Sequence, residues 1–355
     1  MKAVGVQQKA AKGLGKKQPC KPLARTLVAR SGLGEQAPDT LESAADTARA
    51  AGAITDATRI KLDKVISAIR AGAGQGRGDD YQPWIRIRRN FSSPVSHQVL
   101  ESVGINARNH HFLSTLEFKT GLLTSYLGLS HELREGLPLW PYEHPHPDAD
   151  LSLTAIQPKR APGLLDIAHL AGIKHGYYVG TKVPYIASID LLHTLTLGNK
   201  RVLLGISCKP AQKVLDNERV RERLELERLY CESIGALHVI EYGLGFDKTL
   251  IKHLSDYKPF TSQIRAYRGR QQLTDFAGHF EEQADEIPIR EAVSVARTKV
   301  GLDAEMGFLF LRLAMWLHLV DIDLAQALKM GSVARRGSAR VLEQLRARYL
   351  GGLNG

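Results

Sequence analysis

Three polar residues, Asp190, Ser207 and Lys209, lie near the ends of two apolar segments. The segments have the pattern of strands joined at Gly198-Asn199, a dipeptide typical of a two-residue hairpin turn. Such a turn places Asp190 directly opposite Ser207 in the neighbouring strand. Because side chains alternate along a strand, Lys209 is expected on the same face as Ser207. The sequence therefore predicts that the three side chains converge.

The chemistry open to this group depends on what neutralises Asp190. An aspartate in an apolar strand is costly to bury unless a cation, a hydrogen-bond network or a metal ion meets it. The simplest interpretation is a structural ion pair with Lys209. A second carboxylate would widen the possibilities, because two carboxylates can hold Mg²⁺ while a lysine orients the attacking water or balances charge on a phosphate. That combination is what metal-assisted phosphodiester hydrolysis requires.

Glu117 is the candidate for the second carboxylate. It lies in "STLEFKTGLLTSYLGL", which has the pattern of a helix that begins at Ser114. A helix start beside the hairpin would bring Glu117 towards Asp190. The alternative is structural, since Ser114 and Glu117 have the spacing of a capping box, in which the glutamate reaches back to the Ser114 amide.

Other charged or metal-binding side chains have simpler interpretations. His144 and His146 could be metal ligands, but a proline-rich loop with incidental histidines is the better interpretation, because no further soft ligands gather nearby. The segment "DNERVRERLELERLYCESIG" is predicted to be a helix with a charged, solvent-exposed face. That face comprises Glu222, Glu225 and Glu227 together with Arg219, Arg221, Arg223 and Arg228.

The charge of the chain favours a polyanion as its partner. The 355 residues carry a formal net charge of +11, and clustered Lys and Arg release condensed counterions when they meet phosphates. Nucleic acid is therefore the leading class of ligand. The segment "WIRIRRN" would present Arg86, Arg88 and Arg89 to a phosphate backbone, although a solvated edge strand is an equal alternative.

Cysteine usage and hydropathy bear on the compartment. The three cysteines, Cys20, Cys208 and Cys231, are far apart and lack zinc-ligand spacing, which suits a reducing cytoplasm. The apolar stretch from Phe308 is too short to span a membrane and contains Arg312, so it is predicted to be a buried helix. The sequence predicts no membrane association.

The pattern along the chain indicates an α/β protein with a separate helical C-terminal part. We predict a basic, disordered arm over residues 1–34, then a helical extension with a Gly-rich flexible linker over 35–78. The α/β domain is expected over residues 79–245. A small helical domain follows over 246–355, as either a winged-helix DNA-binding module or an all-helical docking domain.

These residues resemble the PD-(D/E)xK nuclease superfamily and, within it, the TnsA family of transposon-end endonuclease subunits. The resemblance covers roughly residues 85–245 and rests on the order and spacing of degenerate motifs. They are "FLSTLEF", "LREGLPLWPYE", "VPYIASIDLL", "LLGISCKP", "ERVRERLELERLYCESIG" and "ALHVIEYG". The helical tail with "GFLFLRLAMWLHLVDIDLAQAL" is also similar to the C-terminal domain of the family.

The resemblance implies a restriction-endonuclease-like core and a role for each candidate residue. Glu117 and Asp190 would be metal-binding carboxylates, and Lys209 would position or activate the water. The Cys208 main-chain carbonyl would complete the set of metal ligands. The sequence departs from the superfamily at Ser207, where Glu or Gln usually stands two residues before the lysine, so Ser207 would be at most a weak or water-mediated ligand.

The resemblance also implies a reaction and a set of partners. It implies Mg²⁺-dependent hydrolysis, with Mn²⁺ as a substitute and no organic cofactor, at the 5′ ends of a transposon in double-stranded DNA. The implied partners are a DDE-type transposase and an AAA+ ATPase regulator, in the bacterial cytoplasm and associated with the nucleoid. Two alternatives stay open: a non-catalytic DNA-binding or assembly subunit, and a nuclease of restriction or junction resolution.

Overall fold

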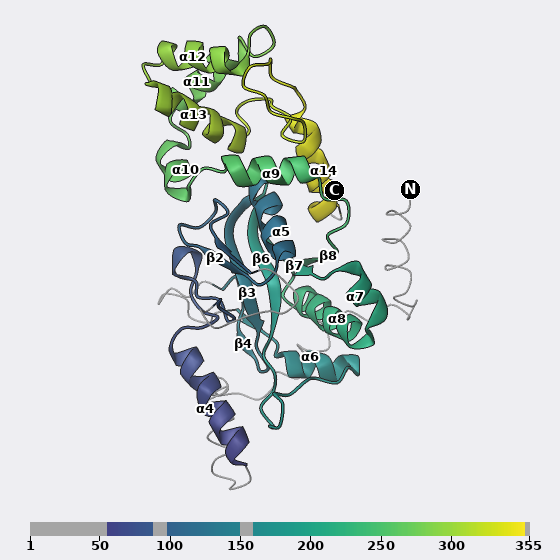
Figure 1. Ribbon diagram of the computed structural model, residues 1–355. Helices are drawn as coiled ribbons and strands as arrows, with labels where there is room; N and C mark the ends of the chain where they lie inside the picture. The colour runs from purple at the N-terminus through teal and green to yellow at the C-terminus, as the bar shows by residue number, and fades with distance from the viewer. Residues whose placement is uncertain (1–54, 88–97, 150–158, 352–355) are drawn as a thin grey trace. The chain divides into compact units, whose positions relative to one another are not determined.

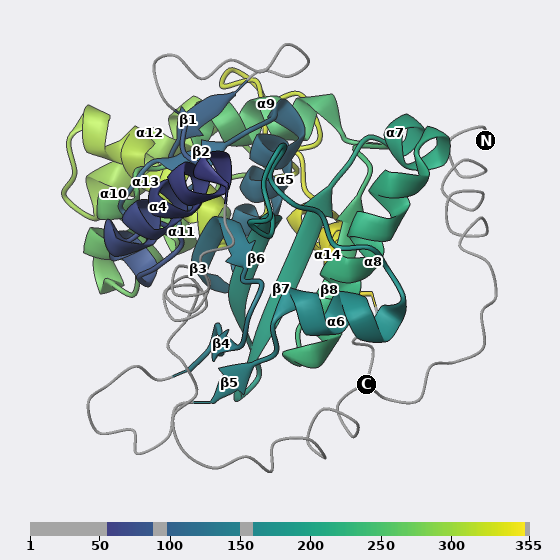
Figure 2. The same cartoon turned by 90° about the horizontal axis from the view of Figure 1, so that it is seen from below.

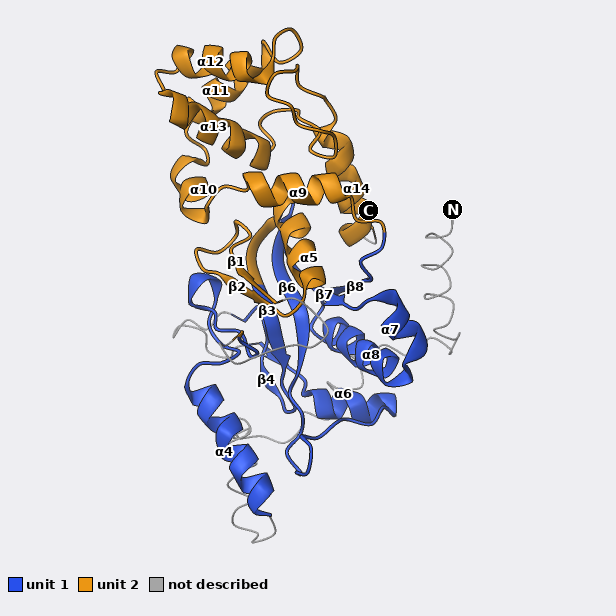
Figure 3. Ribbon diagram, in the orientation of Figure 1, with its two compact units in different colours: residues 1–86, 134–244 blue, residues 87–133, 245–355 orange. Residues whose placement is uncertain are grey.

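The computed structural model describes residues 55–87, 98–149 and 159–351 (Figure 1). The chain divides into two compact units, each made of two separate segments (Figure 3). Unit 1 comprises residues 1–86 and 134–244, and unit 2 comprises residues 87–133 and 245–355. The predicted basic arm, 1–34, lies outside the described residues, as do Arg88 and Arg89. The predicted domain boundaries remain predictions.

Unit 1 is built around a sheet of four strands in the order β3-β6-β7-β8. Strand β3 begins in unit 2 and continues into unit 1. The strands are β3 (Ser130–Leu139), β6 (Ala187–Leu197), β7 (Lys200–Cys208) and β8 (Leu237–Glu241). Because β6 and β7 run antiparallel while β7 and β8 run parallel, the sheet is mixed. The predicted α/β architecture, with a mixed sheet flanked by helices and a helical C-terminal part, is confirmed.

The remaining elements of unit 1 surround this sheet. Helices α6 and α8 lie side by side, and α8 packs against β7 and β8 (Figure 2). The elements are α4 (Asp56–Arg70), the 3₁₀ turn η1 (Gly78–Asp80), the short strands β4 (His144–Pro145) and β5 (Arg160–Ala161), and helices α6 (Leu164–Ala171), α7 (Ala211–Asp216) and α8 (Glu218–Ser233).

The predicted hairpin register is confirmed. Leu197 pairs with Lys200 across the turn, and the pairing continues back to Leu191 and Ile206. Gly198 has a φ of +57°, a left-handed conformation that glycine adopts without steric cost. Asp190 and Ser207 therefore stand one step beyond the last pair of this ladder.

The approach of α8 to β7 depends on Gly205. A Cβ at this position would lie 2.5 Å from Ile189 Cδ1 and 2.7 Å from Cys231 Sγ, so a larger residue would push strand and helix apart. Ile189 and Cys231 belong to the main core of unit 1. The close contact at Gly205 sets the distance between the end of β7 and the preceding turn of α8, where Glu227 lies.

The long strand predicted over residues 177–197 is correct only from Ala187 onward. Its first part turns at Gly180, which has a φ of +72°, and forms a single bridge between Tyr177 and Pro184. Proline has no amide hydrogen for a sheet ladder, which limits its use within a strand. The segment instead places Val183 and Ile186 in a second core, against Leu62, Val65 and Ile66 of α4.

The Gly-rich segment after α4 is packed, in contrast to the predicted flexible linker. A Cβ on Gly74 would lie 2.5 Å from Pro138 Cγ, and one on Gly76 would lie 2.5 Å from the Asp80 carbonyl oxygen. The predicted helix start at Thr55 is confirmed, since its side chain accepts a hydrogen bond from the Thr58 amide. The glycines therefore allow a tight turn that holds α4 against the rest of unit 1.

Unit 2 is mainly helical. It contains a two-stranded antiparallel ladder of β1 (Val99–Glu101) and β2 (His110–Phe112), followed by helix α5 (Thr115–Tyr126). Its C-terminal segment contributes α9 (Lys248–Tyr257), α10 (Thr261–Tyr267), α11 (Gln271–Glu281), α12 (Ile289–Lys299), α13 (Ala304–Trp316) and α14 (Ser338–Leu350). The helix predicted from Phe308 is confirmed as part of α13. None of the helices in the described ranges has the length and apolar character needed to cross a membrane.

The helix predicted for "DIDLAQALKM", residues 321–330, is wrong. Asp321 Oδ1 instead accepts hydrogen bonds from the amides of Gly337 and Ser338, at 3.0 and 2.7 Å. Asp323 accepts one from the Ala325 amide at 2.9 Å and an ion pair from Arg340 at 2.6 Å. Aspartate side chains that capture backbone amides compete with helix formation, and here they fix a loop at the start of α14.

Candidate active site

Asp190 and Lys209 form the centre of the candidate site, at neighbouring ends of β6 and β7. Lys209 Nζ lies 2.6 Å from Asp190 Oδ2, and the Cys208 amide donates to the same oxygen at 2.6 Å. The side chain of Asp190 is 13% exposed and that of Lys209 is 26% exposed. The predicted convergence of these two residues is confirmed, and their charge-assisted bond is partly open to solvent.

The Cys208 carbonyl oxygen takes part in the same cluster. Lys209 Nζ donates to it at 3.1 Å, so the ammonium lies between a carboxylate oxygen and a main-chain carbonyl oxygen. These are two of the oxygens that the sequence resemblance assigns to a metal ion. Both are hard donors of the type that Mg²⁺ prefers, and both already converge on a positive charge. This donor set therefore fits a divalent cation.

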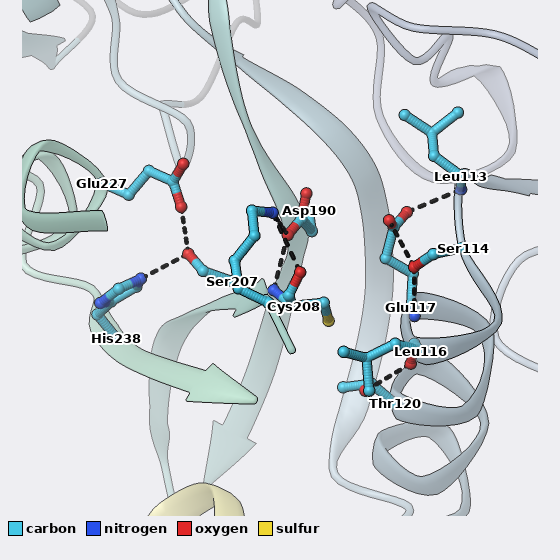
Figure 4. Close-up of polar contacts among 11 residues, drawn as sticks. Leu113, Ser114, Leu116, Glu117, Thr120, Asp190, Ser207, Cys208, Glu227 and His238 are labelled. Carbon is cyan, nitrogen blue, oxygen red and sulfur yellow. Dashed lines mark hydrogen bonds and ion pairs between the residues drawn. The ribbon is translucent and has the colours of Figure 1, made fainter. Parts of the chain in front are cut away.

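Ser207 faces away from the ion pair and is completely buried. Its hydroxyl donates to Glu227 Oε2 from helix α8, and it lies 2.8 Å from His238 Nε2 on β8 (Figure 4). Because the only hydroxyl proton goes to Glu227, His238 Nε2 carries the hydrogen of the second bond. None of the contacts in the described part of the chain joins Ser207 directly to Asp190 or Lys209, so it does not converge with them as predicted.

Glu227 is a functional candidate that the sequence interpretation missed. It was assigned to the solvent-exposed face of the helix, but it is 2% exposed, so that assignment is wrong. Burial raises the pKa of the Glu227 carboxyl to about 7, Lys209 opposes this rise, and Asp190 adds to it. Glu227 is thus close enough to feel the charges of the ion pair. Burial also lowers the pKa of His238 to about 4, so His238 is neutral beside Ser207.

A signal for Glu227 was present in the sequence. It is three residues after Leu224 and three before Tyr230, both of which are buried on the inner face of α8. Residues three or four apart lie on the same side of a helix. Its helical position therefore indicated the core, although its residue type and its charged neighbours suggested solvent.

Glu117 belongs to unit 2 and has the structural role that its spacing predicted. The Ser114 side chain accepts from the Glu117 amide at 3.1 Å and donates to Glu117 Oε1 at 2.9 Å. Glu117 Oε2 accepts from the amide of Leu113 at 2.8 Å, rather than from that of Ser114 as expected. The residue is 7% exposed. A role for Glu117 beside Asp190 remains a prediction.

The predicted DNA-contacting strip is described only at Arg86. Its guanidinium donates to the Gln82 side chain, and the residue is half-buried. No strand forms at residues 83–87 in the described structure, so the alternative of an edge strand is wrong for this part. DNA contact by Arg86 stays a prediction.

His144 and His146 are structural residues, as preferred from the sequence. His144 Nδ1 lies 3.0 Å from the Tyr142 carbonyl oxygen, which can only accept, so Nε2 accepts from the Tyr230 hydroxyl at 2.8 Å. His146 Nε2 lies 2.9 Å from the Ile234 carbonyl oxygen, and its Nδ1 accepts from the Asp148 amide. Both rings are thus committed to neutral hydrogen bonds.

The buried state of His144 predicts acid sensitivity. Burial lowers the pKa of His144 to about 4, whereas the unfolded chain titrates near 6.5. The unfolded state therefore binds more protons between these values, and stability falls as the pH falls from 6.5 to 4. We expect a loss of about 2–3 kcal/mol for this group. The measurement is the free energy of unfolding by urea at pH 7.5, 6, 5 and 4.

His144→Gln is the matched variant, because its amide is neutral at every pH and can accept from Tyr230. We expect the difference in stability between this variant and the wild type to shift by about 2 kcal/mol in favour of the variant between pH 7.5 and 4. A difference that stays constant over this range would show that His144 does not titrate on unfolding.

A cavity of about 330 Å³ lies elsewhere in unit 1. Its lining includes Arg77, Arg134, Trp140, Tyr142 and both structural histidines. It contains none of the predicted catalytic residues. The reactive groups of unit 1 are therefore those at the end of β7.

A mixed sheet with Asp190 and Lys209 at adjacent strand ends is consistent with a protein of the restriction-endonuclease-like class. Over 167 residues, the chain is 32% identical to the transposon Tn7 transposition protein TnsA of Escherichia coli. This similarity supports the assignment of the chain to the TnsA family. The match covers 47% of this chain and 52% of the relative, so the chain spans about half the length of the curated relative it matches. No protein-family model matches the chain.

Proposed function

We propose that this protein is a metal-dependent DNA endonuclease subunit of a heteromeric cut-and-paste transposase. It would hydrolyse the phosphodiester at the 5′ ends of the transposon. The observation that carries the proposal is the position of Lys209 Nζ, which bonds both Asp190 Oδ2 and the Cys208 carbonyl oxygen at the end of a mixed sheet. The similarity to a transposition protein supports the same substrate.

The residues present suit Mg²⁺ or Mn²⁺. In the described part of the chain no group of three or more His, Cys, Asp and Glu side chains is arranged to hold a metal ion. Mg²⁺ does not require one, because it keeps several waters and needs only one or two carboxylates. Asp190 and the Cys208 carbonyl would hold the ion, and Glu117 is the proposed second carboxylate. Once bound, the metal would polarise a phosphate oxygen and activate water.

Lys209 would have two successive positions in this scheme. Without metal its ammonium neutralises Asp190, as the observed contacts indicate. With metal on the Asp190 carboxylate, Lys209 would turn to the scissile phosphate, where it would orient the attacking water or balance developing negative charge. Its partial exposure leaves room for that movement.

The proposed partners follow from the resemblance and from the similarity to TnsA. They are double-stranded DNA at the transposon ends, a DDE-type transposase that cuts and joins the 3′ ends, and an AAA+ ATPase regulator. The net charge of +11 suits the DNA. The proposed location is the bacterial cytoplasm, near the nucleoid.

The test is a reconstituted reaction on end-labelled transposon DNA with the transposase and ATPase encoded beside this gene. We expect cleavage of the 5′ strand only when this protein and Mg²⁺ or Mn²⁺ are both present. Cleavage of the 3′ strand without any 5′ cleavage would overturn the proposal and leave a binding or assembly subunit. Equal cleavage of DNA that lacks transposon ends would favour a nuclease of restriction or junction resolution.

A further inference from the structure

Glu227 is a buried carboxylate whose only printed hydrogen bond, within the described residues, comes from the Ser207 hydroxyl. A buried charge normally has a paired cation or several donors, because its desolvation is expensive. Glu227 has one neutral donor and lies beside the Asp190–Lys209 pair, whose charges act on it. A carboxylate in such a costly position suggests a task beyond packing.

The charges at the end of β7 give Glu227 that task. Asp190 and Lys209 neutralise each other across 2.6 Å and together offer no net attraction to a divalent cation. Glu227 adds a negative charge from α8, directly behind Ser207. The nearest further cation is Arg223 on the same helix, and its effect on Glu227 is smaller than that of Lys209 or Asp190.

The local structure holds Glu227 against β7. Its carboxylate is bonded to Ser207 on the strand, and Cys231, one helical turn later, packs against the open space at Gly205. A cavity of about 80 Å³ borders Glu227 on the side of Arg219 and Arg223, so water can reach this part of the helix. The carboxylate is therefore fixed in place and is adjacent to a hydrated space.

We propose that Glu227 is a positioning carboxylate of the metal site, which acts through Ser207 and supplies from α8 the acidic group that β7 lacks two residues before Lys209. The ligand class is a divalent cation. This inference rests on the proposed function for the use of the metal. Glu227 would raise the affinity of the site for the cation and hold Ser207 and Lys209 in register with Asp190.

The first test uses Mn²⁺ alone, with free Mn²⁺ measured by electron paramagnetic resonance. Glu227→Gln keeps the shape of the side chain and an acceptor for Ser207, but removes the charge. We expect it to weaken Mn²⁺ binding about tenfold, and Asp190→Asn to weaken it at least as much. Glu225→Gln, an exposed change on the same helix, is the matched control and should leave the affinity within twofold of the wild type.

The second test moves the carboxylate. The double variant Ser207→Glu with Glu227→Ser exchanges the two side chains, so the same atoms fill the space but the acid stands on the strand. We expect it to recover Mn²⁺ affinity to within about threefold of the wild type, and to recover 5′-strand cleavage in parallel. In Glu227→Gln, we expect kcat to fall while the KM for DNA is unchanged, because the DNA-binding surface is untouched.

The outcomes separate this inference from the proposed function. Wild-type affinity and cleavage in Glu227→Gln would overturn the inference and leave the nuclease intact. A folded exchange variant that recovers neither property would also overturn it and assign Glu227 to packing. If the wild type itself never cuts the 5′ strand, the proposed function fails, while the Mn²⁺ titrations still decide the role of Glu227.

Discussion

Asp190→Asn is expected to lower 5′-strand cleavage at least about a thousandfold, while DNA binding and 3′-strand cleavage by the partner persist. The amide keeps an oxygen for the Cys208 amide, which donates to Asp190 Oδ2 in the wild type. It removes the charge that pairs with Lys209 and would hold the metal. Cleavage is measured on end-labelled DNA in the reconstituted reaction, and DNA binding is measured by gel shift in the same buffer.

Asp216→Asn is the matched control for this change. Asp216 is an exposed aspartate at the end of α7 that interacts with Gln212, away from the strand ends. We expect its cleavage rate to stay within twofold of the wild type. Asp190→Asn with undiminished cleavage would place the chemistry elsewhere in the complex and reduce the Asp190–Lys209 pair to an ion pair of structural use.

Glu117→Gln is expected to lower cleavage about 100- to 1000-fold with little loss of stability. Glutamine can accept from the Leu113 amide and donate to the Ser114 hydroxyl, so the start of α5 is preserved. A metal-binding role, by contrast, needs the carboxylate. Cleavage and the free energy of urea unfolding are measured on the same preparations.

Ser114→Ala separates the two roles of this helix start. It removes the N-cap of α5, which should cost about 1 kcal/mol of stability, but it leaves the Glu117 carboxylate in the chain. We expect cleavage within a few-fold of the wild type. If Glu117→Gln behaves like Ser114→Ala, with altered stability and normal cleavage, Glu117 is a capping residue alone.

The pairing of Asp190 with Lys209 could be predicted because it depends on local geometry. A two-residue turn at Gly198-Asn199 leaves no freedom in register, and the alternation of a strand does the rest. The same alternation was too simple for Ser207. The end of β7 is covered by α8, so the Ser207 hydroxyl bonds to a helix that the hairpin pattern does not contain.

Other elements were mispredicted where side chains or turns override local propensity. Residues 321–330 have the apolar spacing of a helix, but Asp321 and Asp323 bind amides far along the chain and fix a loop. The stretch before Ala187 has the residue types of a strand, yet Gly180 turns it. In each case the deciding contact is to a residue that periodicity does not connect.

Glu227 shows the same limit in the candidate site. Composition placed it among the exposed charges of α8, whereas helical spacing placed it with Leu224 and Tyr230. A single sequence gives no reason to prefer spacing over residue type when a charged residue stands on an apolar face. The buried partner, Ser207, is what resolves the conflict.

The division of each unit into two chain segments has a consequence for inheritance. The chain passes from one unit to the other after Arg86, within β3 at Leu133–Arg134, and after Leu244. A single genetic crossover therefore cannot exchange unit 2 for that of a relative, because α5 would stay behind while α9 and α14, which pack against it, were replaced. Residues 87–133 and 245–355 are expected to be acquired, or to diverge, together.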